Sequence, residues 1–153
     1  MSITKNINTL IKSLPKNVTL VAVSKTKPVS DILEAYNAGQ RAFGENKIQE
    51  MAQKFEELPK DIEWHMIGHL QSNKVKYMAS FVHLIHGVDS LKTLKEINKQ
   101  ALKNNRIINC LLQLKIAKED TKFGFSYNEV EKLLSSEEFK NLSNIKIKGL
   151  MGM

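Results

Sequence analysis

VTLVAVSKTKP, residues 18–28, is the stretch that decides the fold of this chain. It begins with VTLVAVS, a β-branched apolar run without polar alternation, which is typical of a parallel strand buried on both faces. Pro28 then precedes a helical segment at residues 30–37 that closes at Gly39. The stretch therefore predicts one strand–helix unit of a parallel α/β fold.

The same alternation of strand and helix continues along the chain, without the turn signals of hairpins. Further strands are expected at residues 41–44, 63–67, 82–88, 107–116 and 145–151. Further helices are expected at residues 3–14, 46–58, 73–79, 90–103 and 128–134. Consecutive strands joined by helical crossovers predict a parallel sheet covered by helices.

Length and composition indicate a single domain over residues 1–153, since 42% hydrophobic residues are enough to form a core. No signal peptide is recognisable at the N-terminus, and no window approaches the ~20 apolar residues of a membrane helix. We therefore expect a cytoplasmic protein without a membrane partner. The one cysteine, Cys110, lies in the apolar run CLLQL, which predicts a buried structural thiol.

The formal net charge of +7 raises the question of nucleic acid, because basic chains attract phosphate. The lysines are scattered along the whole chain, however, and aromatic residues are not interleaved with them. This distribution predicts a solvated basic surface and no nucleic-acid partner.

Lys25 directly follows the apolar run, at the carboxyl edge where parallel α/β folds place their sites. Strand alternation places Val21, Val23 and Lys25 on the same side. A lysine amine attacks a carbonyl only when neutral, and burial or a neighbouring cation such as Lys27 favours that form. The pattern alone also fits a lysine whose charged end extends from the strand into water, and this alternative stays open.

Several motifs occur together along the chain. They are AVSKTKP, GQRAFGENKIQE, WHMIGHLQSNK, HGVDS, LLQLKI followed by ED-x-K-x-G, and KGLMGM. In order and approximate spacing, residues 18–153 resemble the pyridoxal-phosphate homeostasis protein family. Length alone would favour an open flavodoxin-like sheet, because a complete barrel takes about 200 residues or more. The resemblance instead implies a parallel β/α barrel of the alanine-racemase N-terminal type, incomplete at about six of eight βα units.

The resemblance implies a non-catalytic protein of pyridoxal 5'-phosphate (PLP) homeostasis. Such a protein holds PLP as a Schiff base on the lysine that matches Lys25, and its partners are PLP-dependent client enzymes. The complete family member is expected to be a monomer. The alternative is a PLP-dependent enzyme resembling an amino-acid racemase, with Lys25 as one base and a second base from a further domain. A basic RNA-binding module is a third hypothesis, which the scattered charge disfavours.

The resemblance also implies further cofactor-binding side chains. Asn46 of the FGEN motif matches an asparagine near the cofactor, although an N-cap of the next helix is an equal alternative. His65 and Met66 are expected beside PLP, but neighbours on a strand cannot both face the barrel interior, and a lone strand histidine also fits a core position. Lys122 matches a lysine at the site entrance, with a solvated surface lysine as the alternative.

Two histidines of the fourth predicted strand carry a separate expectation. His83 and His86 are three residues apart, so they should point to opposite faces and not form a zinc pair. Departures from the family pattern are Lys47, Gly87, where serine is expected, and Lys115, which adds a cation if it points inward. Family members also continue beyond GLMGM with segments that hold the phosphate, so this form is expected to bind PLP weakly.

Overall fold

The computed structural model describes residues 2–116 and 123–153 of the chain. The strands are β1 (Ala22–Val23), β2 (Ala42–Glu45), β3 (Glu63–Met66), β4 (Leu84–Val88), β5 (Ile108–Leu114) and β6 (Ile145–Gly152). The helices are α1 (Ile3–Ser13), α2 (Val29–Asn37), α3 (Ile48–Glu57), the 3-10 helix η1 (Ser72–Tyr77), α4 (Leu91–Lys103), α5 (Tyr127–Ser135) and α6 (Glu137–Lys140). Every predicted element is present, and α6 is an additional short helix.

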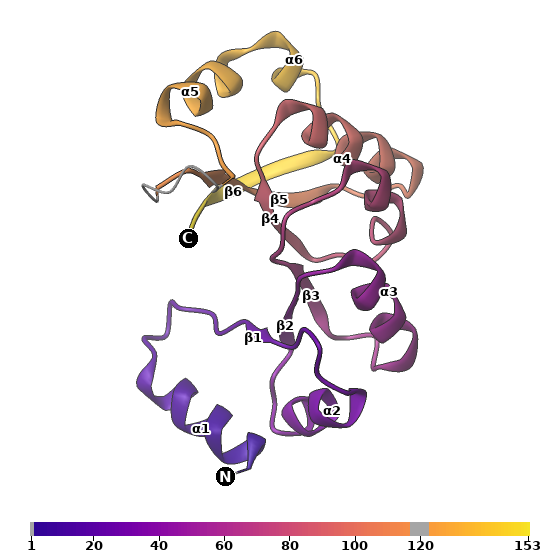
Figure 1. Cartoon of the computed structure of the whole chain (residues 1–153), viewed down its shortest axis with the longest axis vertical. Coiled ribbons are helices and arrows are strands. Elements are labelled where there is room, and N and C mark those ends of the chain that lie inside the picture. Colours follow the sequence, from indigo (N-terminus) through magenta and orange to yellow (C-terminus); the bar gives the residue numbers. More distant parts are fainter. Residues whose placement is uncertain (1, 117–122) are drawn as a thin grey trace.

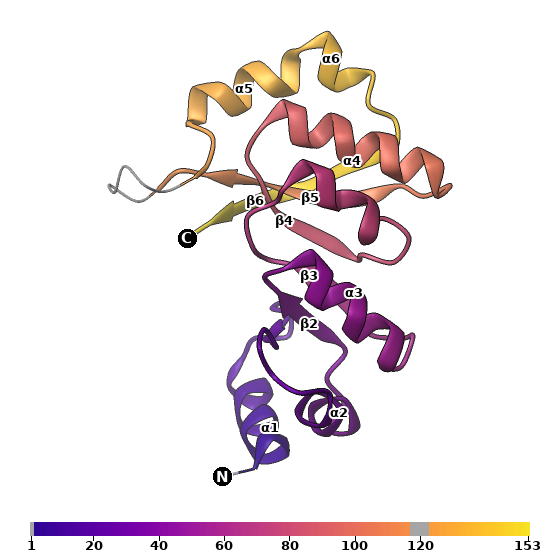
Figure 2. The same ribbon diagram turned by 45° about the vertical axis from the view of Figure 1, so that its right-hand side comes forward.

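The strands form one six-stranded sheet in the order β1-β2-β3-β4-β5-β6, and every neighbouring pair is parallel. A flavodoxin-like sheet would place its strands in the order 2-1-3-4-5, so the consecutive order identifies the barrel type. The sheet is open, with β1 and β6 as its edges, and α2, α3 and α4 follow one side of it (Figures 1 and 2). The prediction of an incomplete parallel barrel is confirmed.

The hydrophobic core lies between the sheet and these outer helices. Strand partners such as Phe43 and Trp64 share the face that packs on the helices, and both are almost completely buried. Cys110 lies on β5 in the same core, where burial raises the pKa of its thiol to about 12. The prediction of a buried structural cysteine is confirmed. Within the described part of the chain, no helix has the length and apolar character needed to cross a bilayer.

The first strand differs from its prediction. Only Ala22 and Val23 form β1, whereas the apolar pattern predicted residues 18–24, and Val23 is 55% exposed instead of buried on both faces. The reason is the position of β1 at the edge of the sheet, where it pairs with β2 alone. An apolar run shows that a strand can be buried, but the strand is buried only where neighbouring strands pack on both of its sides.

The open sheet edges predict self-association of this chain. Among the described residues, the outer edge of the eight-residue strand β6 has no strand partner, and its Leu150 is 55% exposed. Sedimentation velocity should therefore show a species whose mass rises with protein concentration. Leu150→Lys should weaken this association, whereas Leu134→Lys, at an exposed position on α5, should leave it unchanged. A monomer at every concentration would contradict the expectation.

Candidate functional site

A cavity of about 430 Å³ lies at the carboxyl ends of the strands, the edge that carries the sites of parallel α/β folds. The segments after β1, β2, β3 and the ends of β4, β5 and β6 all contribute to its wall. Its described lining residues are Val23, Lys25, Asn46, Ile67, Gly68, His69, His86, Gln113, Phe123, Met151, Gly152 and Met153. The cavity therefore joins segments from the whole length of the chain.

Lys25 follows β1 and is the only lysine among the described residues that line this cavity. Its side chain is exposed, so burial is not what distinguishes it from other lysines in the structure. Lys27, the proposed neighbouring cation, lies outside the cavity lining and instead borders a groove beside α1 and α2. Position at the cavity, and not desolvation, is the property that separates Lys25 from Lys27.

A buried charge network lies beneath Lys25. Lys54 of α3 reaches toward the sheet, and its Nζ lies 2.9 Å from Oε2 of Glu45 and 2.7 Å from Oε2 of Glu50. The Glu45 side chain is fully buried and the Lys54 side chain is 7% exposed. Burial raises the pKa of Glu45, and hydrogen bonds from Ser24 and Lys54 oppose this effect. The Lys54 ammonium holds the pKa of Glu50 below its ordinary value.

This network holds the backbone on both sides of Lys25. The Ser24 carbonyl accepts a hydrogen bond from Lys54 Nζ at 2.7 Å, and the Ser24 hydroxyl donates to Glu45. The Thr26 N–H donates to Glu50 Oε2 at 2.7 Å. The two peptide groups that flank Lys25 are thus each bound to a charged side chain.

His65 of β3 is buried and lies behind the cavity wall. Its Nδ1 lies 2.9 Å from Nε2 of His86, which lines the cavity, and its ring centre is 5.3 Å from that of His83. The prediction that His83 and His86 point away from each other is wrong, because both rings lie against His65. β4 begins only at Leu84, so strand alternation does not govern His83. Among the described residues, no group of acidic, histidine or cysteine side chains is arranged to hold a metal.

The buried histidine predicts acid sensitivity of the fold. Burial, followed by the nearby His86 and His83, lowers the pKa of His65 from 6.5 to about 4. Between these two values the unfolded chain binds a proton that the folded chain does not, so stability should fall as the pH drops through this window. The pKa difference corresponds to about 3 kcal/mol at its largest.

Urea unfolding across this pH window tests the expectation. His65→Gln should flatten the loss of stability on acidification, because its side chain takes up no proton. His83→Gln is the comparison variant, since the His83 side chain is 45% exposed and His83 is the smallest of the causes that lower the pKa of His65. It should keep most of the wild-type loss of stability on acidification. Identical pH profiles for the wild type and His65→Gln would contradict the assignment.

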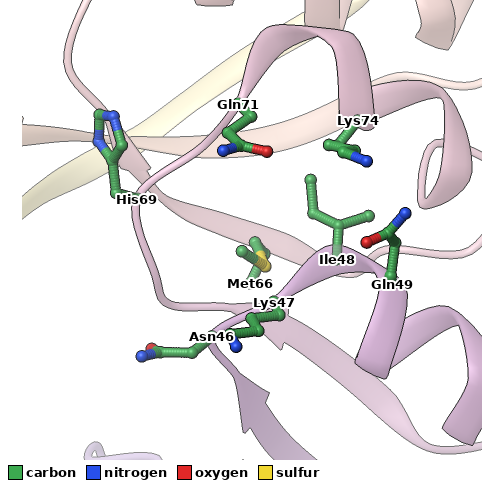
Figure 3. A pocket seen from close by; sticks show the side chains of 8 residues that line it. All are labelled: Asn46, Lys47, Ile48, Gln49, Met66, His69, Gln71 and Lys74. Carbon is green, nitrogen blue, oxygen red and sulfur yellow. The ribbon is translucent and has the colours of Figure 1, made fainter.

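Asn46 and Met66 border a second, smaller cavity of about 290 Å³ beside the first. Figure 3 shows its lining residues, which are Asn46, Lys47, Ile48, Gln49, Met66, His69, Gln71 and Lys74. Asn46 contributes to both cavities, whereas Met66 contributes only to the smaller one and packs with the core. Met66 and His65 therefore lie on opposite faces of β3, as strand alternation predicts.

Two glycines allow the loops of the site to approach one another. A Cβ at Gly68 would lie 2.4 Å from the carbonyl oxygen of Asn46, and a Cβ at Gly87 would lie 2.7 Å from that of Gly68. No side chain fits at either position without movement of the backbone. The close contact at Gly87 explains why glycine, and not the expected serine, suits this sequence.

His69 and Phe123 form the side of the larger cavity nearest β5. Their rings stack with centres 3.9 Å apart and planes inclined by 16°, and His69 Nδ1 lies 3.4 Å from Asp89. Lys115 is exposed and is not among the lining residues, so it adds no charge inside the cavity. Lys122 lies outside the residues that the structure describes.

Several residues that the structure brings to the site were not predicted from the sequence pattern. Glu45, Glu50 and Lys54 had a usable signal, because Glu50 and Lys54 are four residues apart on a predicted helix and Glu45 directly follows a predicted strand. His86 and Gln113 had no comparable signal, since their position at the cavity depends on the order of the strands.

The parallel sheet is open, its strands follow in consecutive order, and a cavity lined by a lysine lies at its carboxyl edge. These features define the class of β/α-barrel domains with a site at the barrel mouth. A family model described as the alanine racemase N-terminal domain matches residues 1–153. The chain is 42% identical over 133 residues to the pyridoxal phosphate homeostasis protein of Aquifex aeolicus, covering 86% of this chain and 58% of that one. It is 40% identical over 157 residues to the protein of the same name from Haemophilus influenzae, covering 99% and 65% of the two chains.

Solved structures agree with these relatives. PipY of Synechococcus elongatus PCC7942 superposes with a TM-score of 0.90 without PLP, at 36% identity, and of 0.89 with PLP bound, at 35% identity. Both comparisons cover 99% of this chain and 70% of PipY. The chain belongs to the alanine racemase N-terminal domain family, among the pyridoxal phosphate homeostasis proteins. It spans less than two thirds of the length of the two curated relatives.

Proposed function

We propose that this chain binds PLP in the cavity at the carboxyl edge of the sheet and holds it as a Schiff base on Lys25. The carrying observation is that Lys25 alone among the described lysines lines this cavity. The PLP bound to PipY and the names of the curated relatives support the choice of ligand. The proposed role is non-catalytic, namely to keep PLP available within the cell.

The residues of the cavity fit the ring and aldehyde of PLP. Its volume of about 430 Å³ lies within the range of small-molecule sites. The Lys25 amine suits the aldehyde carbon, and Asn46, His86 and Gln113 offer donors and acceptors for the polar ring atoms. When bound, PLP supplies an aldehyde that reacts with amines and a ring that withdraws electrons.

The exposure of Lys25 suits a carrier that passes its ligand on. An exposed attachment point leaves a path by which the amine of another protein reaches the same carbon. Enzymes that use PLP are therefore the proposed partners, with Lys25 as the point of transfer. A racemase would in addition need a second base on the opposite side of its substrate.

Reductive trapping tests this function. The 153-residue chain is incubated with excess PLP, reduced with borohydride, weighed as intact protein and mapped by peptides, with a sample lacking PLP as the control. The expected result is one predominant adduct, on Lys25. An adduct spread over surface lysines, or none, would contradict the proposal. Exchange of the α-proton of alanine in D₂O, measured in parallel, would instead indicate the racemase-like enzyme.

A further inference from the structure

We infer that Glu50, together with Glu45 and Lys54, positions Lys25 for reaction with its aldehyde ligand. The inference rests on the proposed function of Lys25 and extends it to residues that do not touch the ligand. They act through the backbone on both sides of Lys25. They are positioning residues, and Glu50 is the one that most directly sets the geometry.

The backbone of Thr26, directly after Lys25, is held by Glu50. Thr26 has a φ of 62°, in the left-handed region that β-branched residues rarely adopt. Its N–H donates to Glu50 Oε2 at 2.7 Å, and its hydroxyl donates to the carbonyl of Lys25 at 2.6 Å. Thr26 is exposed, so packing does not impose this conformation. The carboxylate of Glu50 is the charged contact that holds it.

Glu50 is itself held by the buried Lys54. Lys54 Nζ lies 2.7 Å from the same Glu50 oxygen and 2.9 Å from Glu45 Oε2, and it also donates to the Ser24 carbonyl at 2.7 Å. The lysine is thus anchored by a fully buried carboxylate and cannot turn into solvent without leaving that charge unpaired. Lys54 is therefore held in place. Its contact with Glu50 in turn holds the carboxylate oxygen that accepts the hydrogen bond from the Thr26 N–H.

Both peptide groups that flank Lys25 are held by this network. The peptide before Lys25 is bound through its carbonyl to Lys54, and the peptide after it is bound through its N–H to Glu50. These two contacts set the direction in which the side chain leaves the backbone. Among the hydrogen bonds of the described residues, Lys27 makes neither of these contacts. Its N–H instead donates to the Ser24 carbonyl and closes the turn. This difference adds to the position of Lys25 at the cavity in favouring reaction at Lys25 over Lys27.

The test compares Glu50→Ala, Glu50→Gln and Glu56→Ala. Glu56 is an exposed residue of the same helix and serves as the matched control. In Glu50→Ala, the rate of PLP attachment at Lys25 should fall about tenfold, because the Thr26 N–H loses its charged acceptor and Lys25 loses one of the two contacts that hold its flanking peptides. The trapped adduct should also shift in part from Lys25 to Lys27. Glu50→Gln keeps an acceptor oxygen and should recover part of the loss, whereas Glu56→Ala should match the wild type.

A measurement without PLP separates this inference from the proposed function. Hydrogen exchange of the Thr26 amide should be slowed in the wild type and should accelerate in Glu50→Ala, with an unchanged circular dichroism spectrum. Faster Thr26 exchange with an unchanged Lys25 share and rate of labelling would overturn the positioning role. If the wild type traps no PLP on Lys25, the proposed function is wrong. If Thr26 exchange is the same in Glu50→Ala as in the wild type, the positioning role of Glu50 is wrong, whatever the outcome of the trapping.

Discussion

Lys25→Ala should reduce the PLP adduct trapped by borohydride at least about tenfold, because the variant lacks the only described lysine that lines the cavity. A positioned amine reacts as part of the bound complex, whereas surface lysines react only by collision. Since Lys25 is exposed, the substitution should change the free energy of unfolding by no more than about 0.5 kcal/mol. Loss of the adduct would thus report on chemistry and not on folding.

Two variants serve as controls for this result. Lys27→Ala removes an exposed lysine two residues away that does not line the cavity, and it should keep most of the adduct. Lys122→Ala tests the second lysine that the family resemblance implied, and it too should keep most of the adduct. Peptide mapping that places the label mainly on Lys27 or Lys122 would show that Lys25 is the wrong attachment point.

Lys54→Met should lower the free energy of unfolding by about 3–5 kcal/mol, because it leaves the fully buried carboxylate of Glu45 without its cation. Chemical denaturation at neutral pH measures the change. The difference in stability from the wild type at the same pH should shrink on mild acidification, since protonation of Glu45 removes the unpaired charge. Lys99→Met, at an exposed position of α4, is the control and should change the stability by about 0.5 kcal/mol or less.

A double variant shows whether the effect of Lys54 belongs to the ion pair. Glu45→Gln combined with Lys54→Met removes both charges, and it should be more stable than Lys54→Met alone. Lys54 also contacts Glu50 and the Ser24 carbonyl, so recovery to the wild-type stability is not expected. A double variant that is less stable than either single variant would contradict a dominant role for the Glu45–Lys54 pair.

The local elements of this fold could be predicted from neighbouring residues. Apolar periodicity placed α4 at residues 90–103, and the structure has Leu91–Lys103 with Ser90 as its cap. The strand at residues 107–116 likewise appears as Ile108–Leu114. These features depend on contacts within a few residues of each other, which is why a single sequence contains them.

The limits of prediction lie where distant strands decide the outcome. The apolar run at residues 18–24 has the composition of a buried strand, but its place at the sheet edge leaves only Ala22 and Val23 paired. The spacing of Glu50 and Lys54 is compatible with an ion pair on a helix surface, but nothing in the sequence indicated that Lys54 is buried, because nearly all lysines are exposed. Lys54 is buried because α3 packs on the sheet, where the Glu45 carboxylate of β2 pairs with its ammonium.

By itself, the sequence determined the succession of strands and helices, the cysteine in the core and the position of Lys25 at the carboxyl end of its strand. Its motifs also determined the family. Only the tertiary structure decided that Lys25 and His86 share one cavity, that Glu45, Glu50 and Lys54 hold the flanks of Lys25, and that His65 is buried between two other histidines. The physical reason is that burial and charge pairing depend on strand order and register, which join residues far apart in the chain.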